Sequence, residues 1–404
     1  MQKRTLLLAC CLLPGAVAAA PSFSGKGHAE IRQQTRAGDA ADGEALGQRY
    51  EGVLDSQMNA DRIKANAIVL GRYRSQYDDA EGNVRDEMRS DAELRELFFT
   101  LSADRFEIRA GKQQQAWGRA DYFRIVDVWN PLDLREFLLP YFDNYSLGRQ
   151  PRGMLITDYF GDVWEQQLIV APERKHTRLA PAGSDFAVAG MPASLPAEHN
   201  DGSGLDIGWR GKIFWQGNDI ELYAFHGHHA DQMLTLENAA LVREQPVRDM
   251  LGTSLARPLG DWVLRTDVAH YLNEGRQTAV GIEDSSRTSA LVGFDRVANE
   301  WTWNLQLASS HWYDSESGHD DVWESSAAVE KNWSRYRVST GLLWLVNWVN
   351  DSSQLWRATV SYECLPQWKV TLAGVAFDGK DSTQFGQFDD QDRVMLTLRR
   401  DFSL

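Results

Sequence analysis

Apolar and polar residues alternate strictly along several segments of this chain, and this period of two constrains the fold more than any other feature. From Trp301 to Leu307 every second residue is Trp or Leu, and the residues between them are Thr, Asn and Gln. Successive side chains of a strand point to opposite faces, so such a strand has one apolar and one polar face. The same alternation returns at 336–348 and 356–363. The pattern predicts an all-β protein.

A membrane barrel explains this pattern better than a soluble fold does. Charged residues make up 25% of the chain, mean hydropathy is -0.44, and no internal run approaches the roughly 20 apolar residues that a membrane helix needs. A closed sheet pairs every backbone group, so even a polar chain can cross a bilayer as a barrel. A β-sandwich or β-propeller also alternates, but long aromatic-rich strands favour a transmembrane antiparallel up-and-down β-barrel.

The first residues have the features of a secretory signal. Lys3 and Arg4 precede an apolar centre, and small residues lead to Ala18. We expect removal of residues 1–18. The remaining chain, 19–404, is predicted to form a single barrel in the outer membrane of a Gram-negative cell.

Short and long connections between candidate strands alternate, as they do in bacterial barrels with short periplasmic turns. Counting back from a last strand at 391–402 gives sixteen strands, beginning at 62–77. A further pair at 24–35 and 46–57 makes about eighteen, and the alternative is that 19–60 forms a periplasmic segment. The long connections are expected at 78–92, 118–150, 172–204, 229–249, 273–287, 313–320 and 378–391.

The connection 118–150 is the longest departure from alternation. Asn130 is predicted to cap a short helix that begins at Pro131 and ends at Pro140. Such a loop either packs at the surface or folds into the mouth of the barrel and narrows the pore. Its polar candidates for a pore site are Asp121, Arg124, Asp127, Asn130, Asp133 and Arg135.

Charged residues on the polar faces of the strands are the second candidate site. They would point into the lumen, where rows of charge can select ions or sugars. Cross-strand ion pairs that merely fill the interior are the alternative. The principal candidates are Arg109, Arg265, Asp267, Arg335, Arg337, Arg357 and Glu363, accompanied by Glu107, Lys369, Arg393 and Arg399.

Little in the chain indicates catalysis or a bound cofactor. The one metal-like cluster includes His226, His228 and His229, and strand alternation would divide it between two faces. We find no glycine-rich phosphate loop and no nucleophile elbow. The expectation is no metal, no cofactor and no enzyme, with a barrel hydrolase using His226 or His311 as the alternative. A net charge of -15 argues against a nucleic-acid partner.

The stretch Trp117-Gly-x-x-Asp121 through Asn130-Pro131 resembles a segment of an uncharacterised Gram-negative family of porin-like outer-membrane β-barrels. The detailed resemblance covers residues 106–140. It implies a non-enzymatic barrel, with a role in envelope export or lipid traffic.

The leading functional hypothesis is a channel or transport component for a small or amphiphilic solute. The alternative is a structural barrel that anchors a periplasmic export or electron-transfer complex through 19–60. Expected partners are the lipid bilayer, lipopolysaccharide at acidic loops such as 314–321, and the barrel assembly machinery, which would read a last strand containing Phe402.

Overall fold

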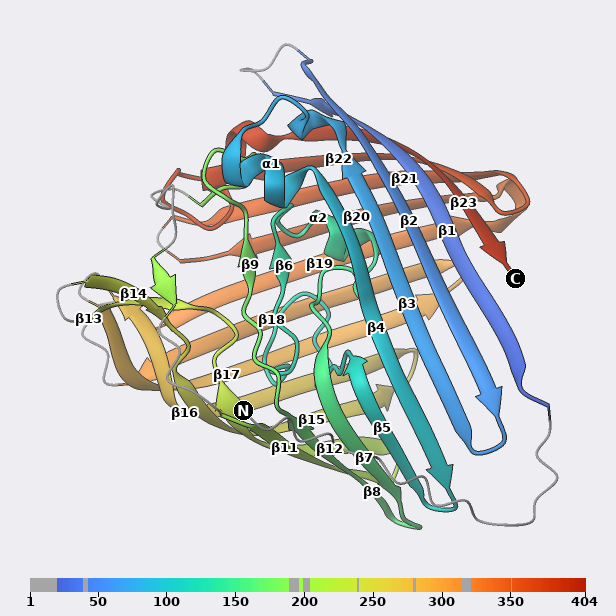
Figure 1. Cartoon of the computed structure of the whole chain (residues 1–404), viewed down its shortest axis with the longest axis vertical. Helices are drawn as coiled ribbons and strands as arrows, with labels where there is room; N and C mark the ends of the chain where they lie inside the picture. The colour runs from blue at the N-terminus through green and yellow to red at the C-terminus, as the bar shows by residue number, and fades with distance from the viewer. Residues whose placement is uncertain are drawn as a thin grey trace, which may run out of the picture.

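The fold is a closed barrel of eighteen antiparallel strands. In the computed structural model, β1 (Ser22–Arg36) pairs with β2 (Ala45–Ala60) on one side and with β23 (Arg393–Ser403) on the other, which closes the sheet (Figure 1). The larger strand number is therefore correct, because 24–35 and 46–57 belong to the wall. The structure describes residues 20–38, 43–188, 196–198, 204–237, 240–278, 281–313, 321–349 and 351–404, so the predicted signal and most of the 313–320 connection lie outside it.

The wall strands follow one another around the barrel in chain order. Among the described residues no helix is long and apolar enough to cross a membrane. The remaining wall strands are β3 (Ile63–Arg74), β4 (Ser90–Ala103), β5 (Phe106–Gln113), β7 (Arg152–Phe160), β8 (Trp164–Ala171), β11 (Asp206–Trp215), β12 (Asn218–His228), β15 (Val247–Leu259), β16 (Trp262–Thr278), β17 (Gly281–Ala298), β18 (Trp301–Tyr313), β19 (Asp321–Trp333), β20 (Val338–Asn347), β21 (Ser353–Leu365) and β22 (Trp368–Asp378). The smaller elements are β6 (Asp133–Leu134), β9 (Arg178–Leu179), β10 (Ala197–Glu198), β13 (Met233–Glu237), β14 (Ala240–Glu244), α1 (Gly82–Met88), α2 (Leu139–Asp143) and 3-10 turns at Ser75–Tyr77, Ser334–Tyr336 and Gly386–Gln391.

Short turns gather at one end of the barrel and long connections at the other, as the alternation of loop lengths predicts. By the convention of bacterial barrels the short-turn end faces the periplasm. One expected long loop, 273–287, is wrong. Its residues instead extend β16 and β17, because the two strands resume pairing at Glu274 and Ser285 after a bulge that follows Tyr271.

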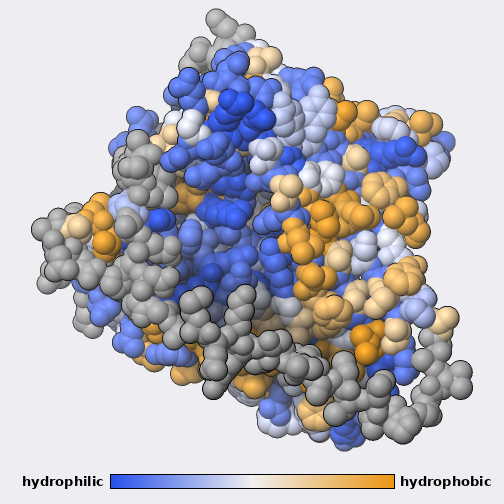
Figure 2. Space-filling view, in the orientation of Figure 1, coloured by the Kyte–Doolittle hydropathy of each residue, from blue (hydrophilic) through white to orange (hydrophobic). Residues whose placement is uncertain are grey.

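The outer face of the barrel is apolar. Trp303, Leu305 and Leu307 on β18 all lie exposed on this face, whereas Gln306 between them is buried on the inner side. Figure 2 shows hydrophobic side chains over the outer wall near β1 to β4 and hydrophilic ones in the hollow between the walls. An apolar belt around a closed sheet with a polar interior is the architecture of Gram-negative outer-membrane barrels, and the protein is one of them.

Part of the inner face departs from the predicted polarity. On β20 the alternation assigned Leu342 and Trp344 to the outside, which leaves Leu343 and Leu345 on the face expected to be polar, and both are buried there. They belong to an apolar cluster inside the barrel that also contains Leu355, Phe377 and Met395. Apolar side chains are stable there because loops, rather than water, cover this part of the wall.

Candidate functional site

The connection between β5 and β7, residues 114–151, enters the barrel and packs against its inner wall. Trp117 and Trp129 are almost completely buried. The ring of Trp117 lies 5.1 Å from Tyr223, and that of Trp129 lies 5.2 Å from Phe225, both centroid to centroid and both on the inner face of β12. Burial of large aromatic surfaces removes this loop from water. We call residues 114–151 the lumenal loop.

The first anchor of the lumenal loop is a turn at Gly118. The Asp267 carboxylate on β16 accepts hydrogen bonds from the backbone N–H groups of Arg119, at 2.8 Å, and Ala120, at 3.0 Å. Gly118 has a φ of +89°, and a Cβ there would lie 2.5 Å from Val126 and 2.8 Å from Asp267. Glycine is required at this point because of both its backbone conformation and its contact with the wall.

Arg119 continues this anchor through its side chain. Its guanidinium contacts the carboxylates of Asp219, at 2.7 Å, and Glu221, at 2.8 Å, on β12. Charge-assisted bonds of this length are among the stronger polar contacts in proteins.

Asp121 joins the lumenal loop to a polar group on β16 and β18. Its carboxylate forms an ion pair with Arg265 and accepts hydrogen bonds from Asn304, at 2.6 Å, and Gln306, at 2.9 Å. Arg265 also contacts Asp295 at 2.6 Å. The Trp117 to Asp121 segment is therefore fixed to the wall over its whole length.

Asn130 closes the neck of the lumenal loop rather than capping a helix. Its side-chain oxygen accepts a hydrogen bond from the Gln115 backbone N–H at 2.7 Å, and its amide donates to the Gln150 carbonyl at 2.8 Å. The predicted helix from Pro131 is wrong. The following residues form β6, which pairs with β9, and the helix present is the five-residue α2.

Pro140 lies near the start of α2 and does not end it. Proline is tolerated in the first turn of a helix because the N–H groups there have no intrahelical partner. The sequence prediction therefore placed the proline at the wrong end of the helix.

Carboxylates of the lumenal loop reach the opposite wall. Glu136 contacts Arg74 on β3 at 2.9 Å. Asp143, the last residue of α2, lies between Arg32 on β1, at 2.5 Å, and Arg357 on β21. Since β1 and β16 are roughly half-way around the circuit from each other, these contacts and those of Asp267 show that the loop spans the lumen.

The other predicted pore residues belong to the same set of contacts. Asp127 forms ion pairs with Arg149 and, at 3.4 Å, with Arg124. Asp133 and Arg135 contact each other at 2.7 Å, and Arg135 reaches Asp91 at 3.0 Å. All six loop candidates therefore lie inside the barrel.

The arginines of the wall keep the loop carboxylates ionised. Although burial opposes ionisation, Arg49, Arg74 and Arg72 hold the pKa of Glu136 well below its ordinary value. Burial likewise opposes ionisation of Asp143, but Arg32 and Arg357 lower its pKa. Both anchors consequently depend on negative charge.

The predicted lumenal charges divide into two groups. Arg109, Arg265, Asp267 and Arg357 lie on the inner wall, and Arg109 contacts Asp158 at 3.1 Å. For the remaining three a place in the lumen stays a prediction. Arg335 and Arg337 lie exposed in the turn before β20, and Glu363 is exposed near the periplasmic end of β21.

A 3-10 turn explains this difference. Residues Ser334–Tyr336 form the turn, and Arg337 follows it with a φ of +54°, so regular alternation starts only at Val338. Of the accompanying candidates, Arg393 is buried within the barrel and contacts Asp185 at 3.4 Å, and Arg399 pairs with Asp401 at 2.6 Å.

Sequence analysis missed a row of arginines on β1 to β3. Arg32 pairs in register with Arg49, which pairs with Arg74, and all three are buried on the inner face. The alternation of polar residues at 28–34 could have indicated them.

One group in the described structure places three possible metal ligands close together. His28, Glu30 and Glu51 have ligand atoms within 4.8 Å of one another. Glu51 is paired with Arg72, at 2.7 Å, and Glu30 with Arg32, at 3.2 Å, so both carboxylates of the group already have cationic partners.

The histidines near 226–229 do not form a common site. His226 is exposed and pairs with Asp249 at 2.8 Å, whereas His228 is buried and pairs with Asp206 at 2.7 Å.

Aromatic residues join the lumenal loop to two other loops. Phe137 has a φ of +50°, and its ring lies 4.8 Å from Phe388 and 6.1 Å from both Phe186 and Phe385. Phe377 on β22 lies 5.9 Å away. A non-glycine residue in this conformation is strained, so the ring contacts of Phe137 must offset that cost.

Residues 46–402 match the model of a protein family described as "Protein of unknown function (DUF1302)". The chain belongs to this family. Among curated proteins a search finds no match. The assignment agrees with the resemblance carried by the Trp117 to Pro131 segment, which in this DUF1302 barrel forms the anchored turn and the neck of the lumenal loop.

Solved outer-membrane proteins share the fold of the DUF1302 chain. Acinetobacter baumannii OccAB4 is 9% identical, with a TM-score of 0.56, over 95% of this chain and 98% of that one. Pseudomonas aeruginosa OccK2 (OpdF), in complex with glucuronate, is 10% identical, with a TM-score of 0.54, over 95% and 98%. P. aeruginosa OpdK with vanillate is 11% identical, with a TM-score of 0.55, over 94% and 99%. At these identities the similarity concerns the fold.

Proposed function

We propose that this DUF1302 barrel is a channel for small solutes that carry a carboxylate, and that the lumenal loop forms its constriction. The contacts of Asp143 with Arg32 and Arg357 carry the proposal, because they hold the loop across the lumen from a wall far from Asp267. A loop fixed at both walls restricts the opening of a barrel otherwise wide enough for an aqueous pore.

The solute class follows from the partners that the inner arginines already have. Arg32, Arg74 and Arg265 each bind a carboxylate supplied by the lumenal loop. Guanidinium groups suit carboxylates because they offer parallel donors in a fixed plane. Structures of OccK2 and OpdK contain glucuronate and vanillate, both carboxylates, which supports the same class here.

The test is planar-bilayer recording of the wild-type barrel and of a variant that lacks residues 119–148. We expect small, anion-selective currents from the wild type and larger, less selective currents from the deletion. Heat-modified gel mobility checks that the deleted barrel has folded. Equally low conductance of the two folded proteins would contradict the proposal.

A variant with one change provides a second measurement. Arg265→Gln keeps every residue of the loop but removes the cation that binds Asp121 and Asp295. Permeation of glucuronate into liposomes should change relative to that of a neutral sugar of similar size. An equal change for both solutes would argue against carboxylate selection.

Dense packing of the lumenal loop favours a second candidate function, a plugged barrel that anchors a periplasmic complex. Val126 and Trp129 are completely buried, as expected for a permanent core. Affinity purification of the barrel from solubilised envelopes would identify such a complex. The test variant changes Arg335 and Arg337, in the exposed periplasmic turn, to Gln. A barrel that purifies alone and conducts ions would exclude this role.

A further inference from the structure

A groove on the lipid-facing side of the barrel crosses β23, β1, β2 and β3. Its cavity has a volume of about 620 Å³. The floor is a row of small residues in register, in which Ala29 pairs with Gly52 and Gly52 with Gly71. The exposed side chains of Ile31, Tyr50 and Tyr73 lie beside this row and form one side of the groove.

The barrel itself does not require the two glycines of the floor. A Cβ added at Gly52 or at Gly71 would meet no atom within 4 Å, and neither residue has a positive φ. Glycine weakens a strand, and one in a strand interior often marks a place where a ligand approaches the backbone. The open space above these glycines is therefore available to a molecule outside the barrel.

The periplasmic end of the groove carries a positive charge. Arg400 pairs in register with both Ala29 and Trp368, and its guanidinium lies 5.4 Å from the centre of the Trp368 ring. Arg400 is exposed, and no carboxylate of the described part of the chain forms an ion pair with it. Trp368 directly follows a periplasmic turn, at the depth where aromatic residues meet lipid headgroups.

The groove rises from this charge into the membrane. Beyond Gly71 the row continues to Ala92, which lies two residues from the loop end of β4. Neighbouring strands are about 4.8 Å apart, so the row from Trp368 to Ala92 spans about 24 Å. An apolar groove along this row, with a cation at its lower end, matches an acyl chain attached to an anionic headgroup.

We propose that this groove binds an anionic glycerophospholipid of the periplasmic leaflet, with its phosphate at Arg400 and one acyl chain along Ala29, Gly52 and Gly71. The site lies outside the lumen, so the inference is independent of the channel proposal.

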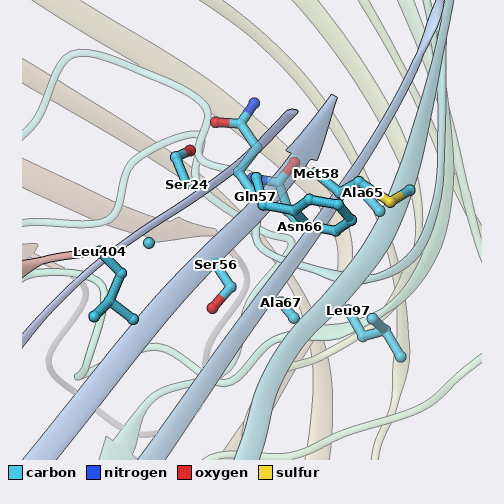
Figure 3. A pocket seen from close by; sticks show the side chains of 11 residues that line it. Ser24, Ser56, Gln57, Met58, Ala65, Asn66, Ala67, Leu97 and Leu404 are labelled. Atoms are coloured by element: carbon cyan, nitrogen blue, oxygen red, sulfur yellow. The ribbon is translucent and has the colours of Figure 1, made fainter. Parts of the chain in front are cut away.

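A second groove on the same wall supplies a matched control. It has a volume of about 380 Å³, and its residues include Gly25, Ser56, Ala67 and Leu97 (Figure 3). No cationic side chain lines it. Both grooves cross β1, β2 and β3 on the lipid-facing side, and only the first has a cationic side chain at its end.

Native mass spectrometry of the purified barrel with phosphatidylglycerol or phosphatidylcholine tests the proposal. Arg400→Gln should weaken binding of phosphatidylglycerol by about fivefold and leave phosphatidylcholine unchanged. Gly52→Leu and Gly71→Leu should abolish retention of both lipids, because their side chains fill the groove. Ala67→Leu, which fills the second groove, should have no effect.

Two results would overturn the proposal. One is retention of phosphatidylglycerol by Gly52→Leu and Arg400→Gln at the wild-type level. The other is a lipid-independent dimer that Gly52→Leu dissociates, since the wall would then be an interface with a second copy. Conductance recorded on the same variants should stay at the wild-type value, which separates this outcome from any failure of the channel proposal.

Discussion

Arg32 on β1 and Asp143 at the end of α2 form an ion pair of 2.5 Å inside the barrel, although 111 positions separate them in the chain. Asp143 is one of the residues through which the lumenal loop contacts the wall opposite Asp267, and Arg357 binds it from a second strand. The loop is therefore bound to two opposite walls of the barrel rather than to one. Its position depends on a few charged contacts at each end.

Replacing Asp143 with Asn should release the far end of the lumenal loop. The change leaves the buried guanidinium of Arg32 with Glu30 as its remaining carboxylate partner, and because Asp143 itself is partly exposed the cost is on the order of 1 kcal/mol. We expect higher mean conductance from a barrel that still folds. Lys26→Gln is the control, because the pair between Lys26 and Asp55 is largely exposed and lies outside the loop contacts. Equal currents from Asp143→Asn and Lys26→Gln would contradict the role of Asp143.

Gly118→Ala should loosen the near end of the loop. The substituted residue would suffer from both its φ of +89° and contacts with Val126 and Asp267. Gly217 provides a matched control, since its φ is +79° but a Cβ there meets nothing within 4 Å. Conformational strain of about 1 kcal/mol applies to both variants. Faster hydrogen exchange at the amides of Arg119 and Ala120 is expected in Gly118→Ala alone, and similar exchange in both variants would show that the wall contact is unimportant.

Sequence alternation was sufficient to predict the barrel and about eighteen strands, with sixteen as the alternative, because every strand that divides lipid from water must repeat with a period of two. The alternation failed where loops cover the inner wall and where a turn takes the place of a strand. Leu343 and Leu345 lie on the inner face, which was expected to be polar, because loops cover them there, and Arg335 and Arg337 occupy a turn rather than a strand. A single sequence contains no periodic signal for either situation.

The candidate site was predictable as residue types but not as contacts. Asp121 and Asp133 were identified as polar residues in an irregular loop, and the structure places both inside the barrel. Their partners, such as Arg265 and Asp91, come from strands distant in the chain. Asn130 was predicted to cap a helix because it stands directly before Pro131, whereas in the structure its side chain closes the loop neck.

Phe137→Ala should loosen three loops together. Its ring packs against Phe186 in the loop after β8, against Phe385 and Phe388 in the loop after β22, and against Phe377 on β22. Truncation of such a ring costs about 3 kcal/mol. Hydrogen exchange should increase in peptides covering 134–142, 181–188 and 384–391. Phe214→Ala removes an aromatic ring of the same type that is 71% exposed on the outer face. An effect confined to 134–142 would show that the three loops are not coupled through Phe137.

Acid should open the channel through the carboxylates of the lumenal loop. The pKa values of Asp133, Glu136 and Asp143 are lowered, because nearby arginines outweigh the effect of burial. Their contribution to docking is therefore complete above the ordinary carboxyl pKa and is lost as the pH falls through the lowered values. Conductance should stay constant from neutral pH down to about pH 5 and rise below about pH 4. Asp143→Asn should show a smaller rise, because one of the titrating anchors is already absent, and a wild-type current that is independent of pH down to the unfolding of the barrel would refute electrostatic docking of the loop.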